Sequence, residues 1–268
     1  MSVAVILGSA WQTPALGGQA LIPFEVDTRF GPVVLHRWNR GRPAWVLFRH
    51  GAPHRYLPNQ IPYRAHACAL AEVGVEAALL TSSVGVMDLA VPLFSPLLVS
   101  DLVMLENRLP DGSACTVYDE PWPGQGHLVL EEGLFSPALG ETVRALSDAV
   151  GHPIVGEVEF TYVGGPRTKT GAENRLLARL GAQVNSMTLG PEAVLLAELG
   201  IPLAAVVVGH KHSHPDAPPV KGETLEALAD SLDASRAATE ALAMAWLDRA
   251  EPVPWGNRLF RFGDEGLQ

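Results

Sequence analysis

The sequence is poor in cysteine and in basic residues. Its two cysteines, Cys68 and Cys115, do not suggest a disulfide framework in a chain of 268 residues. Cys68 lies in an apolar, helix-like run and is expected to be a small core residue. Lys and Arg number 19 against 29 Asp and Glu, which gives a formal net charge of −10. Nucleic acids and anionic membranes select basic surfaces, so neither is expected as a partner.

Long apolar runs and a secretory leader are also missing. The internal runs without charge extend over about a dozen residues, which is too short to cross a bilayer as a helix. The apolar segment before Glu25 has no basic start and is interrupted by Gly8, Pro14, Gly17 and Gly18, unlike a secretory signal. We therefore expect a cytoplasmic protein without a membrane-spanning segment.

Runs typical of buried strands alternate along the chain with runs of helical periodicity. Near-continuous Val, Ile, Leu and Ala predict strands, the clearest at residues 3–8, 43–50, 76–85 and 201–209. Helices are expected at residues 63–74, 135–151, 170–181, 191–200 and 221–250. Thr170, with Glu173 three residues later, has the spacing of a capping box.

This alternation predicts an α/β fold with a central, mostly parallel or mixed twisted sheet flanked by helices. We find no repeat, and no linker long enough to divide the chain. A single domain over residues 1–268 is therefore expected.

Polar or small residues lie at the ends of four of the expected strands. They are Ser9; Arg49 and His50; Ser82 and Ser83; and His210 and Lys211. In open α/β sheets ligands collect at the carboxyl ends of strands, so these groups are expected around one site. The second group lies in a loop rich in Arg and His, "FRHGAPHRYLPNQIPYRAH", at residues 48–66. A local basic loop on an acidic chain indicates a small anion as ligand.

Three blocks of sequence resemble the motifs of one family. They are "RHGAPHRYLPNQIPYRAH" at residues 49–66, "TSSVGVM" at 81–87 and "YVGGPRTKTGAENRLLARLGAQVNSMTLGPEAVLLAELGI" at 162–201. In this order they are similar to the trimeric purine nucleoside phosphorylases, most closely to the methylthioadenosine phosphorylase branch. The resemblance extends from about residue 3 to about residue 212.

The resemblance implies phosphorolysis of a nucleoside. Phosphate attacks the anomeric carbon, the base leaves, and a pentose 1-phosphate forms through a transition state that resembles an oxocarbenium ion. Such an enzyme must hold phosphate beside that carbon and stabilise charge on the departing base. A homotrimer is also implied, with nucleoside and inorganic phosphate as small-molecule ligands and no cofactor.

Position by position, the resemblance assigns a set of phosphate-binding residues: Ser9, Arg49, His50, Ser82, Ser83 and Thr188. The residue types suit this role on their own, because a guanidinium offers a two-pronged donor to phosphate oxygens and hydroxyls add further donors. Alone, the Arg-His pair could instead cap a strand on a solvated loop. The agreement of the other four positions favours an anion site.

The same comparison assigns His54, Tyr63 and Met187 to the sugar. His54 and Tyr63 could hydrogen-bond ribose hydroxyls or the 5′ substituent. Tyr63 could equally be an aromatic residue at a helix start, and Met187 an ordinary core residue. The family closes the 5′ end of the site with a residue of a neighbouring subunit, and His127 or Phe135 is the candidate here.

The base-binding half departs from the family pattern. Lys169 in "GPRTKT" replaces the family's acid, and His210 in "VGHKH" replaces the Asn or Asp that bonds the base. Lysine offers only donors, so a carbonyl-rich or anionic base should fit better than hypoxanthine or guanine. His210 is the candidate general acid. Alternatively, Lys169 extends to solvent and Glu173 or a water supplies the acceptor.

His210, His212 and His214 alternate and would share one face of a strand. This spacing raises the possibility of a metal site. However, Pro215 breaks the strand, and His210 and His212 fall where the related branch carries two Asp contacts to the base. We therefore expect base contacts from both and no metal.

Three functions stay open on the sequence alone. The chain could be a phosphorylase with altered base specificity, a nucleosidase that uses water, or a non-catalytic ligand-binding or assembly homologue. The retained phosphate-binding positions favour the phosphorylase. The sequence determines neither the base nor whether the 5′ position carries a hydroxyl or a thioether.

Overall fold

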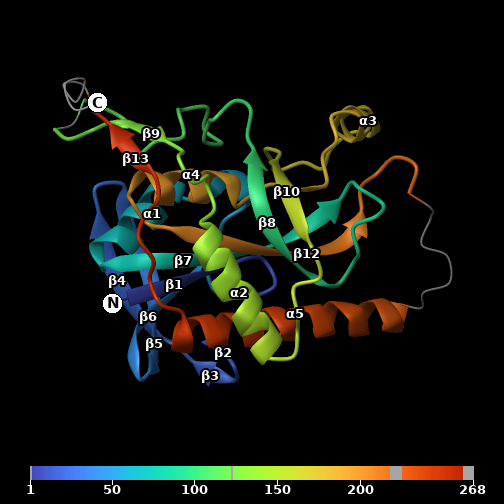
Figure 1. The fold of residues 1–268 in the computed structure, drawn as a ribbon, viewed down its shortest axis with the longest axis horizontal. Coiled ribbons are helices and arrows are strands. Elements are labelled where there is room, and N and C mark those ends of the chain that lie inside the picture. The colour runs from blue at the N-terminus through green and yellow to red at the C-terminus, as the bar shows by residue number, and fades with distance from the viewer. Residues whose placement is uncertain (1, 122, 218–224, 262–268) are drawn as a thin grey trace.

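A mixed sheet runs through the centre of the computed structural model, which describes residues 2–121, 123–217 and 225–261 (Figure 1). The strands of the sheet are β1 Ser2–Leu7, β4 Ile22–Thr28, β5 Gly31–Arg40, β6 Arg42–Phe48, β7 Val75–Val86, β8 Pro96–Val103, β10 Glu157–Tyr162, β11 Val184–Ser186 and β12 Leu203–His212. Within the described ranges their spatial order is β11-β10-β8-β12-β7-β1-β6-β5-β4. Two further pairs lie outside this sheet: β2 Ala15–Leu16 with β3 Gln19–Ala20, and β9 His127–Val129 with β13 Arg258–Phe260.

Part of the sheet closes on itself. β1 lies parallel to β6 and β7, β7 parallel to β12, and β10 parallel to β8 and β11, whereas β8 and β12 are antiparallel. β11 also pairs with β7, with Asn185 opposite Gly85, so that β7, β12, β8, β10 and β11 form a closed ring. The closure brings the carboxyl ends of β7 and β12 next to β11.

Helices cover both faces of the sheet. α2 Pro137–Ala149 and α5 Leu225–Arg249 pack on one face, and α1 Tyr63–Glu72 and α4 Gly190–Glu198 on the other (Figure 1). Along β1, Val3, Val5 and Leu7 join the core of α2 and α5, whereas Ala4 and Ile6 join the core of α1 and α4. Successive side chains of a strand face opposite ways, so a strand that is apolar at every position suits the centre of three layers. The predicted fold class is confirmed.

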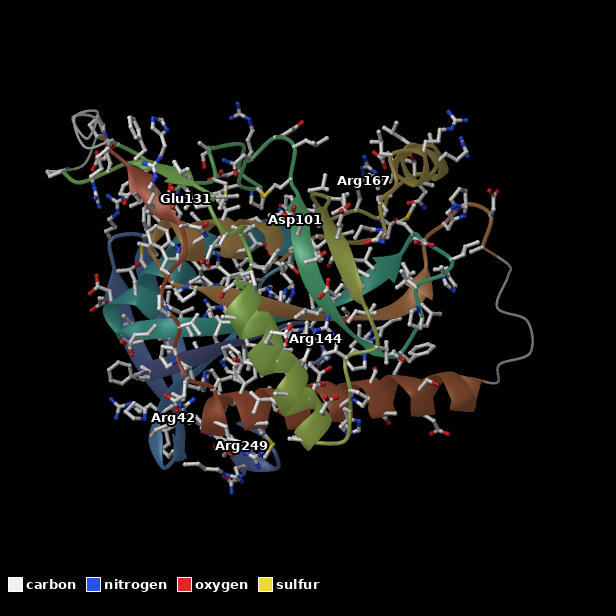
Figure 2. The ribbon with its side chains drawn as sticks, in the orientation of Figure 1. Arg42, Asp101, Glu131, Arg144, Arg167 and Arg249 are labelled. Carbon is white, nitrogen blue, oxygen red and sulfur yellow. The ribbon has the colours of Figure 1, made fainter. Side chains whose placement is uncertain are left out.

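α3 Gly171–Arg179 stands apart from these layers (Figure 1). Its predicted capping box is present: Thr170 Oγ1 accepts from the Glu173 amide at 3.2 Å, and the Glu173 carboxylate accepts from the Thr170 amide at 2.7 Å. Arg167, labelled beside α3 in Figure 2, donates to both carboxylate oxygens of Glu173 at 2.6 and 2.8 Å. These bonds fix the segment that carries Lys169.

Some elements go beyond the expectations from sequence. β4 extends the sheet by an antiparallel edge, and its mostly exposed side chains form no continuous apolar run. The described part of α5 begins at Leu225, so residues 221–224 of the expected helix lie outside the described residues.

Cys115 is buried, while Cys68 is half-buried and packs against the core; both are free thiols. No helix in the described ranges is both long and apolar enough to cross a bilayer.

Candidate active site

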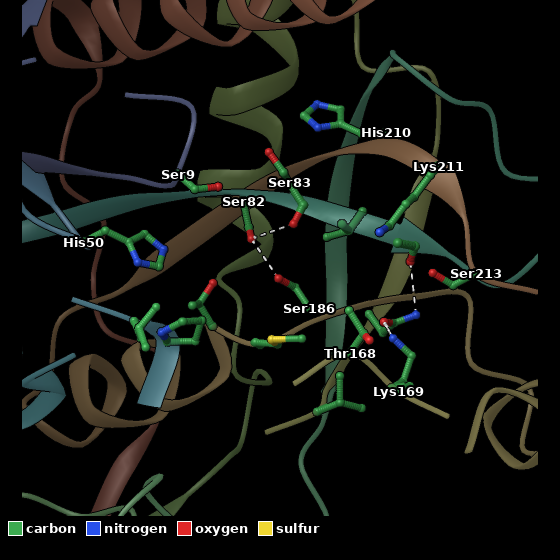
Figure 3. Close-up of a pocket in the computed structure, with 18 of the residues that line it drawn as sticks. Ser9, His50, Ser82, Ser83, Thr168, Lys169, Ser186, His210, Lys211 and Ser213 are labelled. Atoms are coloured by element: carbon green, nitrogen blue, oxygen red, sulfur yellow. Dashed lines mark hydrogen bonds between the residues drawn. The ribbon is translucent and has the colours of Figure 1, made fainter. Parts of the chain in front are cut away.

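A cavity of about 780 Å³ lies at the carboxyl ends of several strands, among them β6, β7 and β12 (Figure 3). The four groups of residues expected at strand ends all line it: Ser9, Arg49, His50, Ser82, Ser83, His210 and Lys211. Its wall also includes five further residues predicted to bind ligand: His54, Lys169, Met187, Thr188 and His212. Tyr63 is the one member of the predicted set that does not line this cavity.

Arg49, directly after β6, is held by a buried carboxylate. Its Nε and Nη2 each donate to an oxygen of Glu192 at 2.6 Å, and its Nη1 donates to the Thr81 carbonyl at 2.9 Å. Arg49 is 0% exposed and Glu192 is 1% exposed. A guanidinium has five N–H groups, so one on each terminal nitrogen is left without a partner among the described residues. Glu192 balances the charge of Arg49, so the arginine offers mainly directed hydrogen bonds.

Gly8 makes room for this guanidinium. A Cβ atom at position 8 would lie 3.0 Å from Arg49 Nη1 and 3.3 Å from the Thr81 carbonyl oxygen. The glycine follows β1 and precedes Ser9, so it also sets where that hydroxyl enters the cavity. Here the backbone approaches the guanidinium closely, and any larger residue at position 8 would require its neighbours to shift.

Thr188 enters the cavity from a tight turn before α4. Leu189 has a φ of +71°, and the Gly190 amide donates to the Thr188 carbonyl at 2.9 Å. A left-handed conformation is uncommon for a side chain of this size, and such strain concentrates where a fold positions functional groups. α4 starts immediately afterwards with no side-chain cap, so its first amides lie close in sequence to Thr188.

The hydrogen bonds of His50 and His54 define their tautomers. His50 Nδ1 lies 2.9 Å from the Tyr56 carbonyl, and His54 Nε2 lies 2.9 Å from the Trp11 carbonyl. A carbonyl oxygen only accepts, so each of these nitrogens carries a hydrogen. Burial lowers the pKa of His50, although the bond to Tyr56 opposes this. At neutral pH the Nε2 atom of His50 is therefore an acceptor, suited to a ligand hydroxyl such as that of hydrogen phosphate.

Tyr63 faces the interior. It is 2% exposed, and its hydroxyl donates to the Pro58 carbonyl at 3.3 Å. Because Tyr63 begins α1, its ring joins the core between that helix and the sheet, as in the alternative raised by the sequence. Phe135 is also buried, and His127 lies exposed on β9 beside a different cavity. Neither of the two lines the main cavity.

Lys169 points into the main cavity (Figure 3). Its Nζ donates to Asn185 Oδ1 at 2.5 Å, and Asn185 Nδ2 donates to the Gly85 carbonyl at 3.2 Å. Burial lowers the pKa of Lys169, and the nearby Lys211 lowers it further, while Glu173 opposes the shift. The structure therefore places this ammonium group against the ligand space and not in free solvent.

Glu173 is occupied elsewhere. The pKa of Glu173 is lowered to about 2, mainly by the hydrogen bonds from Arg167 and to a smaller extent by the hydrogen bond from the Thr170 amide. The carboxylate is committed to the start of α3, and it does not line the cavity. It is thus not placed to supply the acceptor that Lys169 fails to offer.

His210 lies where the main cavity meets a smaller one of about 280 Å³ beside α5. Its ring stacks on Phe94 with centroids 6.3 Å apart, and its Nε2 lies 3.5 Å from Ser235 Oγ. Ser235 donates its single hydrogen to the Leu232 carbonyl, so it accepts from His210. Burial lowers the pKa of His210, which leaves Nδ1 as an acceptor at neutral pH. Proton donation by His210 to a base stays a prediction, and it would require the ring to turn over or to become protonated.

Comparison with known proteins identifies the family. Residues 2–247 match the sequence profile of the phosphorylase superfamily. The chain belongs to this superfamily.

Individual relatives of the superfamily agree with this assignment. A probable 6-oxopurine nucleoside phosphorylase of Thermococcus kodakarensis is 35% identical over 220 residues, which cover 77% of each chain. An S-methyl-5′-thioadenosine phosphorylase of Pyrobaculum aerophilum is 29% identical over 207 residues, covering 75% of this chain and 70% of the relative. Among solved structures, methylthioadenosine phosphorylase from Schistosoma mansoni in complex with tubercidin aligns with a TM-score of 0.75 at 20% identity, covering 92% and 90% of the two chains. The expected family and fold are both confirmed.

The cavity of this superfamily member is cationic. Among the described residues that line it are two arginines, Arg49 and Arg55, and two lysines, Lys169 and Lys211, but no Asp or Glu. From the sequence, Lys211 was expected only to lie at the end of a strand, and no role was expected for Asn185 or Glu192. Both contact predicted site residues through the tertiary fold. Within the described residues no cluster of three His, Cys, Asp or Glu side chains could hold a metal ion.

Proposed function

We propose that the chain catalyses phosphate-dependent cleavage of the N-glycosidic bond of a nucleoside, giving a free base and a pentose 1-phosphate. One observation carries the proposal: the predicted phosphate residues, which come from four separate segments of the chain, line one cavity together with Lys169 and His210. The relatives named as purine nucleoside and methylthioadenosine phosphorylases support the same reaction.

The phosphate end would be built around Arg49. Its two remaining N–H groups and the hydroxyls of Ser9, Ser82 and Thr188 supply directed donors. The neutral His50 accepts the hydrogen of hydrogen phosphate through Nε2. This arrangement holds an anion without adding a large net charge, because Glu192 already balances Arg49.

The reaction then requires phosphate and sugar to be held in line. A phosphate oxygen forms a bond to the anomeric carbon while the bond to the base nitrogen breaks, and the electron pair stays on the base. Positioning of the two reactants supplies much of the rate enhancement in such reactions. His54 and Met187, on the wall of the same cavity, are the proposed sugar contacts. Tyr63 would reach a sugar only after it left its buried position.

Two other functions give different results in one assay. A nucleosidase would release base without phosphate, and a non-catalytic homologue would release none. The test is a panel of nucleosides assayed for base release with and without phosphate. Phosphate-dependent release of pentose 1-phosphate supports the proposal, and phosphate-independent release contradicts it.

A homotrimer is proposed as the working assembly, with His127 of one subunit near the site of another. The family resemblance suggests this, and the surface is consistent with it: Leu105 is 87% exposed and Leu180 is 66% exposed, and both line a cavity of about 490 Å³. Sedimentation of a stable monomer at assay concentration would remove the proposal. Inorganic phosphate as the sole co-substrate, a single domain over residues 1–268 and a cytoplasmic location likewise stay predictions.

A further inference from the structure

Two ammonium groups converge at one end of the cavity. Lys211 of β12 lies opposite Gly85 of β7, and Asn185 of β11 lies opposite the same glycine from the other side. Asn185 holds Lys169 at 2.5 Å, so the ring of strands places both lysines around one point. Figure 3 shows Lys169 and Lys211 on one side of the cavity and Ser9 and His50 on the other, with Ser82 and Ser186 between them.

Among the described residues, no carboxylate forms an ion pair with Lys169 or Lys211. The described residues that line the cavity include no carboxylate, and Glu173 is committed to Arg167 and to the start of α3. We find no hydrogen bond or ion pair of the Lys211 ammonium group with any described residue. The phosphate end differs, because there Glu192 neutralises Arg49. Like charges held together without a counter-ion disfavour each other, and an anionic ligand would relieve this.

We propose that Lys169 and Lys211 form a receptor for the leaving base, and that the preferred substrate is a nucleoside whose base has an edge carrying negative charge at neutral pH. This inference rests on the proposed phosphorolysis and names its substrate class. A purine-2,6-dione is such a base, since its ring N–H ionises near neutral pH. Hypoxanthine has the same purine skeleton and the same 6-oxygen, but it stays neutral.

The receptor also accounts for catalysis without an acid at His210. When the glycosidic bond breaks, the electron pair moves onto the base, and the new bond to carbon is made by an oxygen of hydrogen phosphate. The base gains one negative charge, and fixed ammonium groups stabilise that charge as it develops. Hydrogen phosphate loses one proton in the reaction, and the base finally takes up one proton. Solvent can carry the proton from one to the other, so the reaction needs no proton from an acidic side chain.

The test compares xanthosine with inosine, using the full chain and saturating phosphate. We expect the wild type to prefer xanthosine in kcat/KM by about tenfold or more, the scale of one charge-assisted hydrogen bond. Lys211→Gln and Lys169→Gln should each reduce this preference by about tenfold, and Lys→Arg at either position should keep it because the positive charge is retained. Arg55→Gln is the matched control, because it removes one positive charge from the lining of the same cavity near His50, away from the two lysines, and should leave the ratio unchanged.

The outcomes separate this inference from the proposed function. If the wild type prefers inosine, or if the lysine variants keep the wild-type ratio, the receptor is wrong although phosphorolysis stands. If neither nucleoside is cleaved with phosphate, the proposed function fails and calorimetry with the free bases decides the receptor. Tighter binding of xanthine than of hypoxanthine, lost in both Lys→Gln variants, would support it; equal binding of the two bases, or none, would overturn it.

Discussion

Glu192→Gln is the sharpest test of the buried pair that supports the phosphate end. The substitution keeps the shape of the side chain and one acceptor oxygen for Arg49, but it removes the charge that balances the guanidinium. Breaking a buried ion pair by changing one partner costs about 3–5 kcal/mol, because the other charge stays buried. Since Gln still accepts one hydrogen bond, we expect a loss near the lower end, about 3 kcal/mol.

This loss converts into a measurable change in melting temperature. Unfolding entropy of about 2.1 cal/mol/K per residue gives about 0.56 kcal/mol/K for 268 residues. A loss of about 3 kcal/mol therefore lowers Tm by about 5 °C in the absence of anions. The matched control is Glu141→Gln on α2, where the side chain is 81% exposed and 3.9 Å from Arg144, and no resolvable change is expected there.

Phosphate should then stabilise the variant more than the wild type. With Glu192 neutral, the full charge of Arg49 is available to an anion. If the affinity rises about tenfold, saturating phosphate adds about 1.4 kcal/mol, or about 2.5 °C, beyond the wild-type shift. Thermal unfolding of both proteins with and without phosphate measures this directly. A Glu192→Gln protein as stable as Glu141→Gln, or one that phosphate shifts no more than the wild type, would refute the reasoning. Arg49→Ala is less informative, because it removes a proposed phosphate contact and leaves Glu192 unpaired at the same time.

Further predictions concern the same end of the cavity and, for His66, the buried side of α1. Thr188→Val should weaken phosphate binding about two- to tenfold by calorimetry, the worth of one hydrogen bond, and unchanged affinity would exclude the hydroxyl from the site. Gly8→Ala should lower both Tm and phosphate protection, because its Cβ would lie 3.0 Å from Arg49 Nη1, whereas Gly164→Ala, with nothing within 4 Å, should change neither. Burial, with Arg49 and His50 adding to it, lowers the pKa of His66 from 6.5 to about 3, so the unfolded chain binds a proton there that the native protein does not. The free energy of unfolding should therefore fall by up to about 5 kcal/mol as pH drops from about 6.5 toward 3. In urea titrations at several pH values, His66→Leu should make the free energy of unfolding less dependent on pH in this range. An unchanged pH dependence in that variant would contradict the burial of this ring.

The sequence predicted those parts of the site that depend on neighbours along the chain. Small and polar residues in or after apolar runs indicated the edge of the sheet that carries the cavity, at Ser9, Arg49 and Ser82, because parallel strands place their carboxyl ends at one edge. The capping box of Thr170 and Glu173 was predicted correctly because both partners lie within one helical turn. One assignment depended on side-chain direction: Tyr63 has the expected sequence position, but its ring faces the core.

Only the tertiary structure decided which charges meet. Arg49 and Glu192 are separated by 143 residues and make two bonds of 2.6 Å, which no local pattern could indicate. Lys169 and Lys211 share one end of the cavity because β11 closes the ring of strands against β7, and this closure depends on packing of the whole sheet. The direction of His210 depends on Phe94 and on Ser235 of α5. The sequence by itself therefore determined the fold class, the family and the edge of the sheet that carries the site, since these follow from short-range periodicity and ordered motifs. Charge balance and hydrogen-bond direction within the site came from contacts between distant segments, which only the folded chain brings together.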